Sequence, residues 1–432
     1  MHVVTLLLSL TLCHVRVLAS SPAAEPTTIS FTPQEEYTLA RDFDLDTPQT
    51  LFDVSSLRDG HGGEPSFSLK SQPTTVYRPR SPEALQRARV HALRGEPSEG
   101  EVEWEEVQVM GPYVEDKHTL AQLARITGNA YALPGQKNWY DIDVTWNTSF
   151  PFGWEDAADG FRGHVFLSPG NATVVLSIKG TTLPFQGPTS KKDKFNDNLL
   201  FSCCCARVDF SWTFSQVCGC YAKNWRCDEG CLSKALVEDS LFYNVGVNLI
   251  NNLTALYPTS TIWLVGHSLG GSLASLLGAT FGLPAVTFEA PGERLAAHRL
   301  ALPLPPSVPV THVYHNADPI PQGTCTGPLS LCAQGGYALE TGCHLGKTIV
   351  FDTVGKLGWR VDVLTHTIKT VITKVLEVDL EGGWDSTEDG IKLDVPMARE
   401  EDDCVVSGLC SGKYRSIVDV VLLVGLLQVG VW

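Results

Sequence analysis

A serine set between glycines is the part of this sequence best suited to chemistry. Residues 261–265 are apolar or β-branched and predict a buried strand, Gly266 to Gly270 predict a sharp turn around Ser268, and a helix is expected from Leu269. The pattern G-x-S-x-G also arises by chance, but the strand before it and the helix after it make chance the weaker interpretation. We therefore predict a nucleophile elbow that presents the Ser268 hydroxyl at the carboxyl edge of a sheet.

A serine nucleophile needs a histidine base and a carboxylate that orients the base. On an elbow fold these follow in the order serine, acid, histidine. Asp318 is the best acid because it lies just beyond a predicted strand, although Asp-Pro can also be a simple turn opener. Both His366 and His344 could supply the base, and the residues alone favour His366 without excluding His344. The earlier His312 and His315 are expected to be packing or strand residues.

Two backbone positions could bind the oxyanion that such a reaction forms. The N–H of Leu269 lies at the start of the predicted helix, where the helix dipole is positive. Thr181 follows the β-branched run from Thr173 to Ile178 and could offer a backbone N–H and a hydroxyl. An ordinary Gly-Thr turn at Thr181 is an equally open interpretation.

The elements that must position these residues alternate between strands and helices. An α/β fold with a mostly parallel central sheet flanked by helices follows from this alternation. Strands are predicted at residues 160–167, 173–178, 261–265, 285–288 and 310–314, and helices at 120–130, 233–256 and from the elbow onward.

A polar insertion at residues 183–198 interrupts this pattern. It contains the run Lys191 to Lys194 and directly precedes a cysteine-dense segment. A lid or substrate-facing loop is one interpretation, and a solvated charged loop without a gating role is the other.

Charge and cysteine content restrict the class of protein. The formal net charge of −16 argues against nucleic-acid binding and gives no attraction to anionic membrane surfaces. Of the thirteen cysteines, all but Cys13 of the N-terminal leader are expected to form a disulfide framework whose pairing stays open. A cysteine zinc site is the weaker alternative, because paired C-x-x-C ligands are lacking, and no metal or organic cofactor is expected. Glycosylation sequons, which agree with an oxidising lumen, begin at Asn147, Asn171 and Asn252.

The two ends of the chain are apolar, but each run is short for a bilayer span. Residues 1–19 predict a membrane-targeting leader, for which physical argument favours a cleaved signal peptide and leaves a retained signal anchor open. Residues 417–432 are apolar and have no assigned role, with a lipid-anchor signal as a lesser alternative.

Several segments together resemble the fungal autophagy-related lipases of vacuolar vesicle breakdown, within the class 3 lipase superfamily. The resemblance extends over roughly residues 115–380. It is most specific at a triple-cysteine segment, and the segments that carry it are Gly266–Gly271, Asn196–Cys205, Tyr314–Pro321 and Cys343–Lys347.

The resemblance implies an α/β-hydrolase fold, a triad of Ser268, Asp318 and His366, and hydrolysis of phospholipid membranes of intravacuolar vesicles. It also implies a type II membrane protein that reaches the vacuole through Golgi and multivesicular bodies. The alternatives are a secreted glyceride or small-ester hydrolase, and an inactive hydrolase fold that binds membranes; the oligomeric state stays open. The expected organisation is a leader at 1–19, a lumenal and partly disordered region with short packing elements at 20–100, a lipase domain at 101–380, an acidic mobile tail at 381–416 and the apolar end at 417–432.

Overall fold

The structure is a computed structural model, and the account that follows concerns the residues it describes. These are residues 27–31, 67–94, 102–142, 150–155, 160–168, 171–182, 188–202, 206–208, 214–216, 220, 228–239, 241–326, 330–401 and 404. The predicted leader, the sequon at Asn147 and the apolar end lie outside them. Within the described ranges, no helix combines the length and the apolar character that a membrane crossing requires.

A mixed sheet forms the centre of the domain. Among the described residues it has eight strands in the order β15-β12-β11-β10-β9-β6-β5-β4. The middle strands β6, β9, β10, β11 and β12 run parallel to one another, and the pairs β15–β12, β6–β5 and β5–β4 towards the edges are antiparallel. The strand bounds are β4 Phe150–Phe152, β5 Gly163–Leu167, β6 Thr173–Ile178, β9 Thr261–His267, β10 Ala285–Phe288, β11 Val310–His315, β12 Lys347–Phe351 and β15 Arg399–Glu400. This order confirms the predicted α/β class with a mostly parallel sheet.

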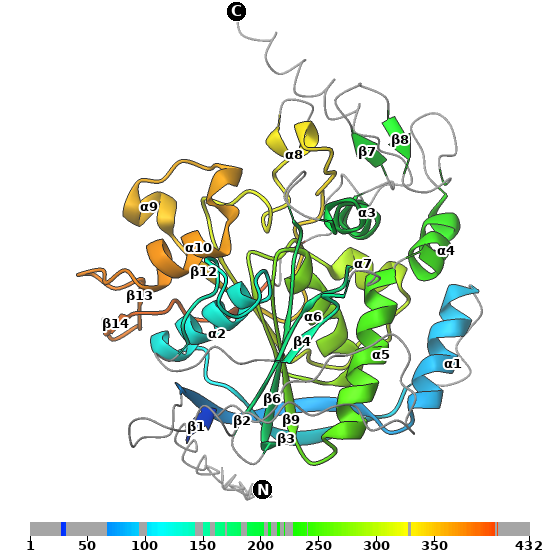
Figure 1. Cartoon of the computed structure of the whole chain (residues 1–432), viewed down its shortest axis with the longest axis horizontal. Helices are drawn as coiled ribbons and strands as arrows, with labels where there is room; N and C mark the ends of the chain where they lie inside the picture. Colours follow the sequence, from blue (N-terminus) through cyan, green and yellow to red (C-terminus); the bar gives the residue numbers. More distant parts are fainter. Residues whose placement is uncertain are drawn as a thin grey trace, which may run out of the picture.

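Helices cover both faces of the sheet, and successive residues of β9 belong to the two cores. Leu264 packs in the core beneath α5 (Leu241–Leu256) and α6 (Leu269–Phe281). Trp263 and Val265 pack in the core beneath α2 (Lys117–Asn129) and the segment of α10 (Ile368–Thr370) and η4 (Val371–Leu376). Figure 1 shows α2 and α10 on one side of the sheet and α5 and α6 on the other. Since side chains alternate along a strand, one short run fills both cores.

Ordered structure begins well before residue 101. The strands β1 (Thr27–Phe31), β2 (Phe67–Pro79) and β3 (Trp104–Pro112) form a small antiparallel sheet, and α1 (Pro82–Leu93) follows β2. The Trp263 indole donates to the carbonyl of Met110, and Arg89 donates to the carbonyl of Leu300. The expected division at residue 101 therefore cuts through one sheet that packs on the main domain.

The polar insertion differs from both interpretations of it. Residues 190–201 form α3 (Ser190–Phe201), in which Asp193, Asn196, Asp197 and Asn198 are buried. These polar groups bond to neighbouring segments instead of to solvent, so the described part is neither a lid nor a solvated loop. Residues 183–187 lie outside the described part.

The expected helix over 233–256 is two helices, α4 (Glu229–Asp239) and α5. The other elements are short. They are β7 Ala206–Val208, β8 Phe214–Gln216, α7 Arg294–Arg299, α8 Leu331–Gln334, α9 Thr353–Leu357, η3 Val363–His366, β13 Asp385–Ser386 and β14 Lys392–Leu393.

Three disulfides lie within the described residues. They join Cys220 to Cys231, Cys325 to Cys332 and Cys343 to Cys404. The last two hold the chain around Asp318 and around His344. We expect these six cysteines to give no free thiol in denatured, unreduced protein, as measured by thiol titration and by mass spectrometry of linked peptides. Free thiols at these positions would contradict the oxidising compartment.

Candidate active site

The turn between β9 and α6 places Ser268 in a strained backbone conformation. Its φ and ψ angles are 57° and −130°, which few residues other than glycine adopt. The chain packs so closely around the turn that positions 266 and 270 must be glycine. A Cβ on Gly266 would fall 2.2 Å from the Gly270 carbonyl oxygen, and one on Gly270 would fall 2.3 Å from the Ile178 carbonyl oxygen. The structure therefore has the predicted nucleophile elbow, with Ser268 7% exposed.

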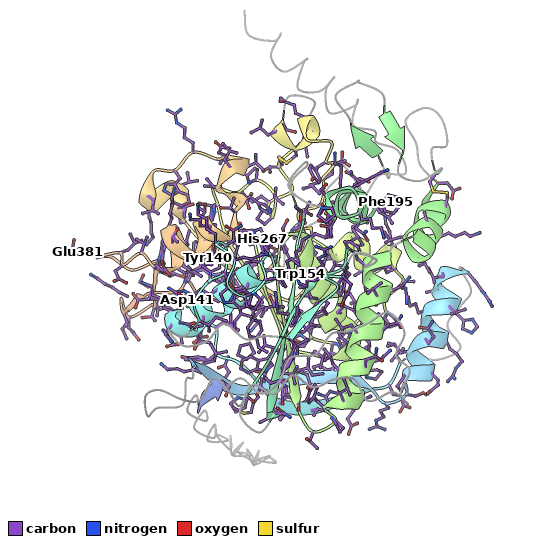
Figure 2. The ribbon with its side chains drawn as sticks, in the orientation of Figure 1. Tyr140, Asp141, Trp154, Phe195, His267 and Glu381 are labelled. Atoms are coloured by element: carbon purple, nitrogen blue, oxygen red, sulfur yellow. A yellow bond between two sulfur atoms is a disulfide. The ribbon has the colours of Figure 1, made fainter. Side chains whose placement is uncertain are left out.

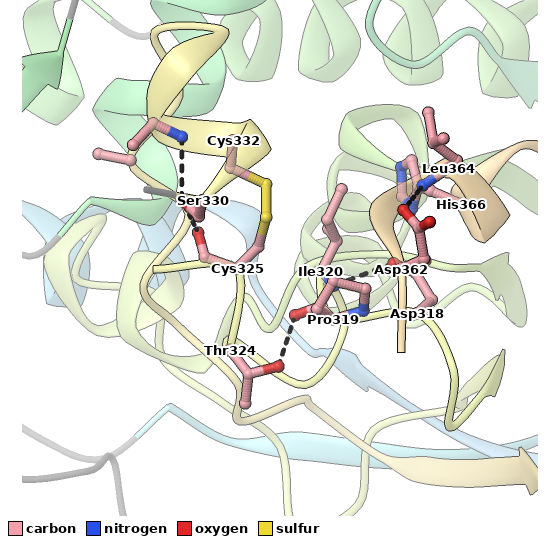
Figure 3. Close-up of a disulfide and its surroundings, with 12 residues drawn as sticks. Asp318, Pro319, Ile320, Thr324, Cys325, Ser330, Cys332, Asp362, Leu364 and His366 are labelled. Atoms are coloured by element: carbon pink, nitrogen blue, oxygen red, sulfur yellow. Dashed lines mark hydrogen bonds and ion pairs between the residues drawn. A yellow bond between two sulfur atoms is a disulfide. The ribbon is translucent and has the colours of Figure 1, made fainter. Parts of the chain in front are cut away.

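Ser268, Asp318 and His366 meet at the carboxyl edge of the sheet. The Ser268 Oγ lies 2.8 Å from His366 Nε2, and His366 Nδ1 lies 2.6 Å from Asp318 Oδ2. Asp318 is fully buried and also accepts from the N–H of Ile320 at 3.0 Å (Figure 3). A carboxylate can only accept, so His366 Nδ1 carries the proton and Nε2 is free to accept from the serine hydroxyl. This is the geometry of a nucleophile, a base and an orienting acid.

A second carboxyl, that of Glu289, faces Asp318 at the end of β10. Burial and the adjacent Asp318 charge raise the pKa of Glu289 well above its usual range. Burial also works against the charge of Asp318, but His366 and the hydrogen bonds around it hold the pKa of Asp318 below its usual value. Glu289 is therefore the protonated member of the pair, and Asp318 keeps the negative charge that a His366 cation needs.

His267 connects the elbow to the backbone of His366. Its Nε2 lies 2.7 Å from the His366 carbonyl oxygen, and its Nδ1 lies 2.7 Å from the Tyr131 hydroxyl. Since a carbonyl oxygen only accepts, Nε2 carries the hydrogen and the Tyr131 hydroxyl donates to Nδ1. Burial, assisted by the nearby His366, lowers the pKa of His267 to about 3, so this ring stays neutral. Figure 2 labels His267 near the centre of the domain.

The predicted oxyanion positions lie beside the serine. Leu269 is the first residue of α6, and a Cβ on Gly180, next to Thr181, would fall 3.1 Å from the Ser268 Cβ. The Thr181 hydroxyl donates its one hydrogen to Asp197 Oδ2 at 2.5 Å, so the backbone N–H of Thr181 is the group left to bind an oxyanion. The position of Thr181 is therefore fixed by α3.

The buried carboxyl of Asp197 gives the fold a dependence on pH. Burial raises its pKa to about 7, opposed by the Thr181 hydrogen bond and assisted by the charge of Asp193. The folded state therefore binds this proton more tightly than the unfolded state. The stability that the bound proton contributes is fully present below the unfolded pKa of 3.8 and is lost as pH rises through 7.

We expect Asp197→Asn to lose less stability than the wild type between pH 5 and pH 8, because asparagine does not ionise. The measurement is the thermal unfolding midpoint of both proteins at the two pH values. Equal losses in the two proteins would contradict the raised pKa.

His344, the alternative base, lies away from the serine. It is fully buried, with Nδ1 2.9 Å from Glu401 Oε1 and Nε2 3.0 Å from the Ala290 carbonyl oxygen. His312 and His315 lie on β11, as strand residues were expected to. Of the sequons within the described residues, Asn171 and Asn252 are both half-buried on surface turns or helices.

Sequence reasoning missed Tyr131, Asp197, His267 and Glu289. Glu289 could have been found, because it follows a predicted strand at the sheet edge that also carries Asp318. Tyr131 and Asp197 gave no local signal, since Tyr131 bonds to His267, which is 136 residues away, and Asp197 bonds to Thr181 in a different element, 16 residues away.

Comparisons with known proteins point to lipases. The family described as Lipase (class 3) matches residues 208–325. A protein named "Putative lipase ATG15" from Cryptococcus neoformans var. neoformans is 54% identical over 303 residues, which are 67% of this chain and 58% of that protein. One of the same name from Saccharomyces cerevisiae is 45% identical over 325 residues, 72% of this chain and 62% of that protein. The chain thus spans about three fifths of these relatives.

Among solved structures, the Lip2 lipase of Yarrowia lipolytica matches 54% of this chain and 77% of its own with 16% identity and a TM-score of 0.30. The fold assignment rests on the strand order and the elbow described above.

Proposed function

Because the chain belongs to the class 3 lipase family, we propose that it is a serine-triad hydrolase that cleaves acyl esters of membrane phospholipids. The observation that carries the proposal is the continuous chain of hydrogen bonds from Ser268 through His366 to Asp318. Lipid ester hydrolysis is the activity named for its relatives, and phospholipid is the part that this proposal adds.

The geometry supports a two-step acyl transfer. His366 Nε2 takes the Ser268 proton as Oγ attacks the ester carbonyl carbon, and the carbonyl oxygen becomes an oxyanion beside the N–H of Leu269. The C–O bond to the alcohol then breaks, and His366 returns the proton to the departing oxygen. Water repeats the steps on the acyl-enzyme, which releases the fatty acid and restores Ser268. Asp318 stabilises the His366 cation in both steps.

Exposed apolar side chains beside the base support a lipid surface as substrate. Val361 is 57% exposed and Leu364 is 72% exposed, and both lie within five residues of His366 along the chain. The net charge of −16 gives no general attraction to anionic lipid, so contact with a membrane would have to be apolar. Such side chains next to the reacting residues suit an enzyme that works at the surface of a bilayer.

The cellular setting is part of the same proposal. We infer that the protein is a type II membrane protein that passes through Golgi and multivesicular bodies, and that it breaks down vesicle membranes in the vacuole lumen. The disulfides support an oxidising compartment. Sensitivity of the protein to endoglycosidase H and its co-fractionation with vacuoles would test this, and a cytosolic, unglycosylated protein would contradict it.

Three substrates separate the proposal from its rivals. Purified protein is offered phosphatidylcholine vesicles, a triglyceride emulsion and a short-chain nitrophenyl ester, with Ser268→Ala as the control. We expect fatty acid release from the vesicles by the wild type and none above background by the variant. Hydrolysis of the short ester or the triglyceride, with no hydrolysis of phospholipid, would favour a glyceride or small-ester hydrolase. Vesicle binding without any hydrolysis would favour an inactive membrane-binding protein.

A further inference from the structure

Three buried side chains outside the triad converge at one point beside the elbow helix. Glu293, His312 and His344 each offer a ligand atom, and these atoms all lie within 4.8 Å of one another. Glu293 precedes α7, His312 lies on β11, and His344 lies in the loop before β12. We propose that these three residues bind one divalent transition-metal ion, and that zinc suits the site best.

Both histidines are oriented as metal ligands usually are. The Nδ1 of His312 lies 2.7 Å from the Thr287 hydroxyl, and the Nδ1 of His344 lies 2.9 Å from Glu401 Oε1. In metal sites the ring nitrogen that does not bind the ion is commonly held by a carboxylate or another polar group, which fixes the ring and makes the ligand more basic. The Nε2 atoms would therefore be the ligands, and that of His344, which lies 3.0 Å from the Ala290 carbonyl oxygen, would release its hydrogen when the ion binds.

Two polar atoms at the centre of the cluster have no hydrogen bond to any residue that the structure describes. They are His312 Nε2 and Glu293 Oε2. Glu293 is fully buried and His312 is 1% exposed, so bulk water does not supply the missing partners. Leaving such groups unpaired in a protein interior is costly, and a bound cation would satisfy both at once.

The distances fit a small four-coordinate ion. Ligands at about 2.0–2.1 Å from a tetrahedral zinc lie roughly 3.3 Å apart. His312 Nε2 lies 3.2 Å from Glu293 Oε1, and the ligand atoms of all three residues lie within 4.8 Å of one another, so a small shift of the side chains would bring them to this spacing. Two imidazoles and a carboxylate are donors that zinc accepts.

The competing explanation is that protons alone balance the cluster. Glu401 Oε1 lies 2.9 Å from His344 Nδ1 and Glu293 Oε1 lies 3.2 Å from His312 Nε2, so the two carboxylates could balance protonated histidines. The same two carboxylates also attract a metal cation. A proton on His312 Nε2 would pair with Glu293 Oε1 but leave Glu293 Oε2 without a partner among the described residues, whereas an ion could bind Oε2 as well, and this difference favours the metal.

The ion would have a structural role. All three ligands are buried, which leaves no open coordination position for substrate. Glu293 accepts from Ser275 of α6 at 2.5 Å, and the Cys343–Cys404 disulfide lies next to His344 and Glu401 in the chain. The ion would tie the elbow helix, β11 and the C-terminal strand together. No metal was expected from the sequence because the cysteines lack the spacing of zinc ligands, whereas this site uses histidine and glutamate.

Metal content and thermal stability test the site without any assay of hydrolysis. The full chain, purified without a histidine tag and dialysed against metal-free buffer, is measured by mass spectrometry of the elements. The ligand variant is His312→Asn, because the asparagine amide can keep the contact with Thr287 while Nε2 is lost. The matched control is His298→Asn, since His298 is an exposed histidine on α7.

We expect about one zinc per chain in the wild type and in His298→Asn, and little zinc in His312→Asn. A strong chelator should lower the unfolding midpoint of the wild type by several degrees, and added zinc should restore it. The chelator should not change the midpoint of His312→Asn. Wild type that carries no metal and gains no stability from added zinc would overturn the proposal, as would full zinc content in His312→Asn. If His312→Asn does not fold, the chelation and re-addition on the wild type decide alone.

Discussion

Ser268→Ala should abolish ester hydrolysis while the protein still folds. The substitution removes one oxygen, and that oxygen is the atom aligned with His366 Nε2 at 2.8 Å. In triads of this type the loss of the nucleophile lowers kcat by about 10^4-fold or more. The measurement is fatty acid release from phospholipid vesicles per folded molecule.

Ser272→Ala is the matched control for this experiment. Ser272 lies one turn further along α6, where its hydroxyl donates to the Pro291 carbonyl at 2.6 Å. Its loss should lower stability and leave turnover per folded molecule close to that of the wild type. Wild-type turnover in a folded Ser268→Ala protein, or loss of activity in both variants alike, would contradict the assignment.

His366→Ala should slow the covalent labelling of the protein by a fluorophosphonate probe by about 10^4-fold. The probe reports the reactivity of the serine directly. Without His366 nothing takes the Ser268 proton, yet the Leu269 N–H and the elbow remain in place. The rate is measured at matched concentrations of folded protein.

His344→Ala is the comparison that separates the two histidines. Its ring contacts Glu401 and the Ala290 carbonyl instead of the serine, so the change should lower the unfolding temperature and leave the labelling rate nearly unchanged. If His344→Ala lost labelling and His366→Ala kept it, the roles of the two residues would have to be exchanged.

The elbow and the parallel strands could be predicted from sequence because their signals are local. The apolar run of β9 and the glycines at 266 and 270 determine the conformation of Ser268, and all of them lie within ten residues of it. Asp318 could be placed for a similar reason, since it follows β11 at the edge where parallel strands end. The choice between His344 and His366 could not be made locally, because it depends on which loop folds back over the serine.

Other features could not be predicted from the sequence because polar residues that are usually exposed are buried here. Residues 190–198 look like a solvated loop, but Asp193 accepts from buried Lys179 at 2.8 Å and Asp197 accepts from Thr181. Pairing with residues outside this segment made burial of these polar groups possible, and composition does not reveal such partners. The start of folded structure was predicted too late for a related reason. The long β2 strand is polar along its exposed face, so the sequence did not reveal that it pairs with β3.

The most direct test of the proposed mechanism is to locate the fluorophosphonate adduct on the labelled wild-type protein by tandem mass spectrometry. The strained turn, the hydrogen bond to His366 and the negative charge of Asp318 all predict that the adduct is found on Ser268. An adduct on a different serine, or a protein whose elbow peptide stays unmodified at full probe exposure, would contradict the account.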